Sequence, residues 1–144
     1  MKKKIAIIGS TGSIGKSTIQ VIKENRNDFN ILLLSTNNNV NKIYKQAVEL
    51  NVKNVIINNR FKYLKIKNKF KKKKIKVYFD HANIKKIIKK KLDYCMCAIS
   101  GLDGLSPTLE AIKCSKVVGI ANKESIICGW NLIQKNLNKY KTRF

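Results

Sequence analysis

The stretch IAIIGSTGSIG, from Ile5 to Gly15, decides the fold of this 144-residue chain. Its first four residues, Ile5–Ile8, predict a buried strand, and the three glycines of Gly9–Gly15 predict a tight turn directly behind it. The amphipathic segment Ser17–Glu24 then predicts a helix. A strand, a glycine-rich turn and a helix start in this order are typical of the phosphate-binding turn of a dinucleotide-binding fold, where free N–H groups of the helix face an anion.

A P-loop is the competing interpretation of the same turn. The tripeptide Gly15–Ser17 (GKS) matches the tail of the motif GxxxxGK[ST], but the first glycine of that motif falls on Ser10. A P-loop also needs an aspartate at the end of an apolar strand to hold magnesium, whereas Asp103 lies in a loop-like stretch. We therefore favour dinucleotide binding over a P-loop ATPase or kinase, although the spacing is GxxGxxG and not the GxGxxG of many NAD enzymes.

Strand and helix patterns alternate along the whole chain. This alternation predicts an α/β fold, a Rossmann-like doubly wound parallel sheet with helices on both faces, in one domain over residues 1–144. The expected strands are Lys4–Ile8, Asn30–Leu34, Asn54–Ile57, Ile75–Tyr78, Tyr94–Ile99 and Val117–Ile120. The expected helices are Lys16–Asn25, Val40–Leu50, Arg60–Phe70, Asn83–Leu92, Pro107–Lys113 and Ser125–Leu137.

Two of these helices carry further local signals. In Asn83–Leu92, three isoleucines and the final leucine fall on one helical face with lysines opposite. In the next helix, Ser106 is expected as the N-cap and Pro107 as the first helical residue, where a missing N–H costs nothing.

The net charge of +23 raises the question of nucleic-acid binding. The densest segment, Arg60–Lys91, holds 15 lysines or arginines and one acid, Asp80. It is almost entirely lysine, with few interleaved aromatic residues and no recognition motif. The charge therefore indicates solvated helix faces and salt-sensitive adhesion to polyanions, and no specific nucleic-acid partner is expected.

The cysteines give no sign of a metal site or of disulfides. None of Cys95, Cys97, Cys114 and Cys128 forms a CxxC pair, and His81 is the single histidine, so we expect free thiols buried in strands and helices. No apolar run reaches the roughly 18 residues of a membrane span, and no signal or transit peptide is evident. The expected location is the cytoplasm, with no membrane partner.

The loops that follow the strands are the expected ligand-binding segments, because parallel sheets bind ligands beyond the carboxyl ends of their strands. These loops are Gly9–Gly15, Ser35–Asn39, Ser100–Gly104 and Ala121–Glu124. Ser35–Asn39 contains no acid to repel a 2′-phosphate, so NADP is permitted, but it contains no Lys or Arg to hold that phosphate either. Lys42 is the nearest cation that could reach it from the next helix.

Two charges stand at the start of the last helix. Lys123, at the end of a strand, would place an ammonium in the binding crevice, which suits an anionic substrate. Glu124 would open the helix and interact favourably with its dipole.

Three motifs together resemble 1-deoxy-D-xylulose 5-phosphate reductoisomerases. They are GSTGSIG (Gly9–Gly15), AISGLDGLSPTLEAI (Ala98–Ile112) and ANKES (Ala121–Ser125), in the family's order and spacing. The resemblance covers Lys4–Asn39 and Tyr94–Lys135 well, and Asn51–Leu92 in rhythm only. It implies NADPH-dependent isomerisation and reduction of 1-deoxy-D-xylulose 5-phosphate to 2-C-methyl-D-erythritol 4-phosphate in non-mevalonate isoprenoid biosynthesis.

The resemblance also implies roles for individual residues. The substrate, a small sugar phosphate, is expected at Lys123. The NADPH pyrophosphate region is expected at Thr11, Gly12, Ser13 and Ile14, its adenosine ribose at Asn39, and further NADPH contacts at Asn122 and Glu124. A divalent metal, Mg or Mn, serves the family as a Lewis acid, and homodimers are typical of it.

Two departures from the family pattern limit what this chain is expected to do. Asn37 and Asn38 replace a common glycine and basic residue, so binding of the 2′-phosphate is in question. The chain ends at Phe144, before the PVDSEH-type stretch that bears the first metal ligands, so neither catalytic residues nor metal ligands are assigned. An N-terminal fragment that is inactive alone is expected, with a stand-alone NAD(P)-binding or regulatory module as the alternative.

Overall fold

The computed structural model describes residues 1–144, apart from the side chain of residue 67. In this described part, six strands form one parallel sheet in the order β4-β3-β2-β1-β5-β6. The strands are β1 (Lys3–Ile8), β2 (Phe29–Thr36), β3 (Asn54–Ile57), β4 (Lys76–Phe79), β5 (Tyr94–Cys97) and β6 (Val118–Ile120). The α-helices are α1 (Ser13–Glu24), α2 (Val40–Glu49), α3 (Arg60–Lys71), α4 (Ile84–Ile87), α5 (Leu105–Cys114) and α6 (Lys123–Tyr140), with short 3₁₀ turns η1 (His81–Asn83) and η2 (Leu102–Gly104).

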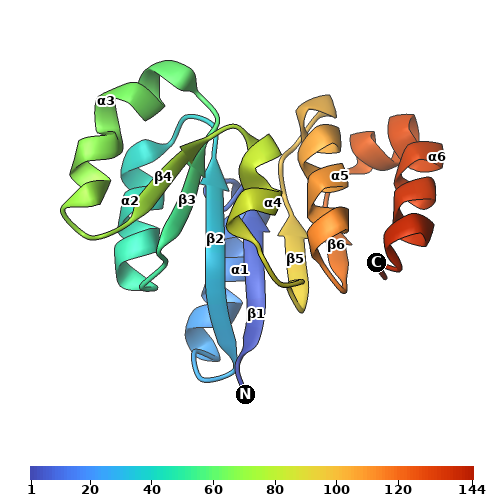
Figure 1. The fold of residues 1–144 in the computed structure, drawn as a ribbon, viewed down its shortest axis with the longest axis horizontal. Helices are drawn as coiled ribbons and strands as arrows, with labels where there is room; N and C mark the ends of the chain where they lie inside the picture. Colours follow the sequence, from blue (N-terminus) through green and yellow to red (C-terminus); the bar gives the residue numbers. More distant parts are fainter.

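Both faces of the sheet are buried under helices. Along β1, Ile5 and Ile7 point to one face and Ala6 and Ile8 to the other, as the two-residue period of a strand requires. Helices α1 and α2 cover the first face and α4, α5 and α6 cover the second (Figure 1). This arrangement confirms the predicted Rossmann-like doubly wound sheet.

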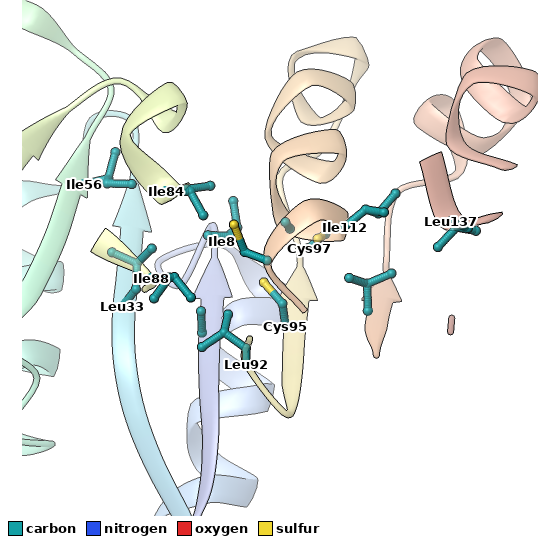
Figure 2. Close-up of a cluster of buried hydrophobic side chains, with 14 of the residues drawn as sticks. Ile8, Leu33, Ile56, Ile84, Ile88, Leu92, Cys95, Cys97, Ile112 and Leu137 are labelled. Carbon is teal, nitrogen blue, oxygen red and sulfur yellow. The ribbon is translucent and has the colours of Figure 1, made fainter. Parts of the chain in front are cut away.

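A continuous apolar cluster joins β1 to the α4, α5 and α6 side of the sheet. Figure 2 shows Ile8 and Leu33 from the sheet meeting Ile84 of α4, with the thiols of β5 beside them. Each of these side chains is essentially excluded from solvent. Burial of a side chain of this size stabilises the fold by about 1.5–3 kcal/mol, so this cluster fixes the central strands in place.

The direction in which the sheet grows reverses at β1. The chain runs outward from β1 through β2, β3 and β4, and then β5 returns to pair with the free side of β1 (Figure 1). A reversal of this kind leaves a crevice at the carboxyl ends of the strands, which is where doubly wound folds bind ligands. The glycine-rich turn follows β1 and so lies at this point.

The helix predicted over Asn83–Leu92 is much shorter than expected. Only Ile84–Ile87 is α-helical, and Ile88 already has extended backbone angles (φ −94°, ψ 92°). The chain must be extended there because the Leu92 N–H donates to the Cys114 carbonyl (2.8 Å) in a bridge beside the sheet. The apolar side chains of the predicted helical face, among them Ile84, Ile88 and Leu92, are nevertheless buried.

Other predictions fail at element boundaries. Helix α1 begins at Ser13, inside the glycine triad, and not at Lys16. Helix α5 begins at Leu105 because η2 leads directly into it, so Pro107 is its third residue and Ser106 is not its N-cap. A proline is tolerated there because N–H groups of the first turn have no partner within the helix.

The thiols also differ from the prediction at one position. Cys95, Cys97 and Cys114 are buried, but Cys128 is exposed on α6. No disulfide pairs them in the structure, since all four are free. None of the described helices is both long and apolar enough to cross a membrane.

Candidate functional site

The carboxyl ends of four strands meet around one small cavity, which we call the switch pocket. Its volume is about 180 Å³. It is lined by residues at or just after the ends of β1, β2, β3 and β5, together with His81 from the segment after β4. The lining consists of Gly9, Thr11, Gly12, Thr36, Asn37, Asn58, His81, Ala98, Ile99, Ser100 and Asp103.

Two glycines allow the backbones around this pocket to approach one another. Gly9 has φ +91°, and a Cβ on it would lie 2.7 Å from the Ala98 carbonyl oxygen. A Cβ on Gly15 would lie 2.2 Å from the Gly9 carbonyl oxygen. These separations are shorter than any tolerable contact, so both positions require glycine for the turn to close against α1 and β5.

The N-terminus of α1 is open toward solvent beside the pocket. Gly12 is its N-cap, and within the described residues no side chain caps the helix and no acid lies in its first turn. Ser13 and Ile14 are exposed. Thr11, which precedes the N-cap, is held in place because its hydroxyl lies 2.7 Å from the Thr36 hydroxyl at the end of β2. An uncapped helix start of this kind presents N–H groups and a positive dipole end to an anion.

His81 supports the glycine turn from the side of β4. The Ser35 hydroxyl accepts a hydrogen bond from the Gly9 N–H (2.9 Å), and its oxygen lies 3.1 Å from His81 Nε2. Burial lowers the pKa of His81 to about 4, against a smaller opposing effect of Asp80. The imidazole is therefore neutral at physiological pH, and an unprotonated Nε2 can accept the Ser35 proton.

The start of α6 is closed, in contrast to the start of α1. Asn122 is 3% exposed, and its side-chain oxygen accepts from the Ser125 N–H (2.9 Å). Its amide donates to the carbonyls of Ile99 (2.5 Å) and Gly101 (2.7 Å). Asn122 thus ties the loop after β5 to α6, and its whole side chain is engaged with backbone.

The chain matches the family model described as 1-deoxy-D-xylulose 5-phosphate reductoisomerase over residues 5–129. The chain belongs to this reductoisomerase family. The matched range includes Asn51–Leu92, the segment in which the sequence resembles the family in rhythm only. The resemblance inferred from the three motifs is confirmed.

Named relatives agree with this assignment. A reductoisomerase of Pelagibacter ubique is 53% identical over 99% of this chain and 37% of its own length. The solved reductoisomerase of Zymomonas mobilis in complex with NADPH has a TM-score of 0.90 at 28% identity, covering 99% of this chain and 38% of that one. A further reductoisomerase, in complex with NADPH, fosmidomycin and magnesium, has a TM-score of 0.88 at 28% identity over 97% of this chain and 35% of its own. The chain thus spans somewhat more than a third of the length of the relatives it matches.

The structure brings some of the residues predicted from the reductoisomerase resemblance together and leaves others apart. Thr11 and Gly12 line the switch pocket, and Ser13 and Ile14 follow them at the start of α1. Asn39 is exposed at the start of α2 and lines a second pocket beyond the loop after β2. Lys123 is exposed and Glu124 half-buried at the start of α6, and the described lining of the switch pocket includes neither.

Two lining residues of the switch pocket escaped the sequence analysis. His81 and Asn58 reach it from segments that follow β4 and β3, whereas Asp103 of η2 lies within the predicted loop Ser100–Gly104. His81 had a detectable signal, since a lone histidine directly after a strand of a parallel sheet lies at the ligand-binding edge. Asn58 stands in a polar run that looks like any turn.

Metal binding in the reductoisomerase family has no counterpart among the side chains described in this chain. No three of the described His, Cys, Asp and Glu side chains lie close enough together to hold an ion. The residues present therefore do not fit a divalent metal, and no step is assigned to one.

Proposed function

We propose that residues 1–144 form the NADPH-binding domain of a 1-deoxy-D-xylulose 5-phosphate reductoisomerase. In this proposal the reaction as a whole isomerises and reduces 1-deoxy-D-xylulose 5-phosphate to 2-C-methyl-D-erythritol 4-phosphate in isoprenoid biosynthesis. These residues perform the cofactor-binding part of it. Two relatives of matching fold are complexes with NADPH, which supports this cofactor.

The observation that carries the proposal is the glycine turn at the switch pocket. It combines an uncapped helix start, free of acids in its first turn among the described residues, with glycines whose Cβ atoms would collide with backbone. Backbone N–H groups can reach a pyrophosphate only where no side chain stands between them. Gly12 provides this opening, because it is exposed and lies in the pocket lining.

The assignment of residues follows from their place around the turn. Thr11, Gly12, Ser13 and Ile14 would contact the pyrophosphate region, and Asn39 the adenosine ribose. Asn122 would act on NADPH by holding the loop after β5, since its side chain is bonded to Ile99 and Gly101. Glu124 would contact NADPH and Lys123 the anionic substrate.

A fluorescence titration of the 144-residue protein with NADPH, NADH and ATP tests the proposal. Saturable micromolar binding that favours NADPH is expected. Preference for ATP would favour the P-loop interpretation, and absence of saturable binding to all three would refute nucleotide binding altogether.

The variant Gly12→Val locates the site within the same assay. A Cβ at Gly12 meets only ordinary contacts, at 3.5 Å from the Gly9 carbonyl oxygen and 3.7 Å from that of Ala98, so the fold should persist. The side chain should nevertheless block the pyrophosphate and abolish NADPH binding. Ser17→Val, an exposed β-branched substitution on the same helix, is the matched control and should leave NADPH affinity unchanged. Unchanged affinity in Gly12→Val would show that the site is elsewhere.

A further inference from the structure

A second pocket lies beyond the loop after β2, and lysines of α3 line it. This pocket, which we call the lysine pocket, has a volume of about 570 Å³. Its lining is Asn38, Asn39, Val40, Asn41, Lys62, Lys65 and Ile66, and this described lining includes two cations and no acid. The pocket is therefore open to an anionic group.

Hydrogen bonds hold the start of α3 against the loop after β2. The Lys62 ammonium donates to the Asn38 carbonyl (2.9 Å), and the Asn59 amide donates to Asn38 Oδ1 (2.9 Å). Asn59 also caps α3, since its side chain accepts from the Lys62 N–H (3.0 Å). Lys62 is thus placed by a capped helix start and by a direct bond to the loop, although its side chain is exposed.

The anchored ammonium of Lys62 keeps donors available for a ligand. A lysine ammonium carries three protons, and the Asn38 carbonyl takes one of them. The other two can donate to phosphate oxygens in charge-assisted hydrogen bonds, which are stronger than neutral ones.

The lysine pocket adjoins the switch pocket along the loop after β2. Thr36 and Asn37 line the switch pocket, and the next two residues, Asn38 and Asn39, line the lysine pocket. In dinucleotide-binding folds the loop after the second strand contacts the ribose 2′ position, and a nearby cation accommodates a 2′-phosphate. Here that loop carries only asparagines, so a cation must come from another element.

Lys42, the cation expected from the sequence, faces a different neighbour. It is half-buried on α2, and the described lining of the lysine pocket does not include it. Partial burial, together with repulsion from the nearby Lys16 ammonium, lowers the pKa of Lys42. Lys42 thus lies close to Lys16 of α1.

We propose that Lys62, with Lys65 beside it, binds the 2′-phosphate of NADPH and determines the preference for NADPH over NADH. This inference rests on the proposed function, because it assumes a cofactor at the switch pocket. The phosphate-binding cation of this chain is then supplied by α3, and the asparagines of the loop hold that cation in place.

Titrations with NADPH and NADH on matched variants test this role. Lys62→Gln should raise the Kd for NADPH about tenfold, the usual value of a charged hydrogen bond, and leave the Kd for NADH within about twofold. Lys71→Gln removes the same charge from the far end of α3 and should change neither, which controls for the overall field of the protein. Lys62→Arg keeps the charge and should keep the preference for NADPH. It therefore tests the role of the Lys62 charge even if Lys62→Gln does not fold.

The outcomes separate this inference from the proposed function. Wild-type protein that binds neither cofactor would overturn both. Wild-type protein that binds NADPH, with Lys62→Gln unchanged or with both affinities reduced equally, would overturn the role of Lys62 alone. Selective loss of NADPH affinity in Lys42→Gln, with none in Lys62→Gln, would assign the 2′-phosphate to Lys42.

Discussion

Two regions of the molecule depend on different physical constraints. One comprises the glycine-containing turns that follow β1 and β5, and the other is the lysine-rich segment Arg60–Lys91, which we call the lysine-rich middle. In the turns, a Cβ on Gly15 would lie 2.2 Å from the Gly9 carbonyl, and one on Gly104 would lie 2.2 Å from the Asn122 amide. In the middle, α3 leaves Phe61 80% exposed. Close contacts at these glycines leave no room for a Cβ, whereas much of the surface of α3 faces solvent.

This difference explains why each of the three sequence motifs includes a turn after a strand. Where two backbone segments lie in close contact, only glycine is acceptable, and this requirement is visible in the sequence. A surface helix needs apolar residues only on the side that packs against the core. Its solvent-facing positions therefore accept many residue types, including lysine. The middle is constrained where it enters the core, as at Phe70, and where it contacts the turns, at His81 and at Lys62.

Gly15→Ala should separate the two regions most strongly. The added methyl would collide with the Gly9 carbonyl and with Ser10 Cα, 2.6 Å away, and backbone atoms cannot move aside cheaply. We expect the free energy of unfolding to fall by about 4 kcal/mol or more, measured by chemical denaturation. Gly12→Ala, where the space is open, is the control and should cost less than about 1 kcal/mol. Equal effects of the two variants would mean that close approach does not define the turn.

Lowering the pH should destabilise the protein through His81. Burial lowers the pKa of this imidazole from 6.5 to about 4, so between these values the unfolded chain binds a proton that the native protein does not. The contribution of neutral His81 to stability is fully present above the unfolded-state pKa and is lost as the pH falls toward the native-state pKa. From about pH 8 to about pH 5 the free energy of unfolding should drop by about 2 kcal/mol.

The variant His81→Gln isolates this effect from that of every other titrating group. Its stability should vary less over the same range, because glutamine takes up no proton. Identical pH profiles for the wild type and His81→Gln, measured by denaturation at each pH, would show that His81 is not the group responsible.

Phe61→Ala should have the smallest effect. Its ring is exposed, so the free energy of unfolding should change by no more than about 0.5 kcal/mol. Phe70→Ala, at the buried end of the same helix, is the matched control and should cost about 3 kcal/mol or more. A large loss from Phe61→Ala would mean that α3 is covered by another surface in solution.

Much of this fold was predictable because its signals are local. The strand β3 was predicted at its observed bounds, and the glycine turn was placed correctly because the close contact of Gly15 with Gly9 and Ser10 is local. The error at Asn83–Leu92 arose because pairing of Leu92 beside Cys114 overrides the helical pattern, and no local signal reports a partner 22 residues away. Lys62 was missed for a similar reason, since its bond to Asn38 spans 24 residues.

The reactivity of the four thiols can report how fast the native protein opens. Cys128 is exposed on α6, whereas the other three lie within the sheet and α5, where burial raises the pKa of Cys114. A thiol reagent should therefore consume one equivalent at once. The remaining three equivalents should follow at the rate at which the β5 and α5 side of the core opens, so labelling kinetics report that motion without any introduced probe.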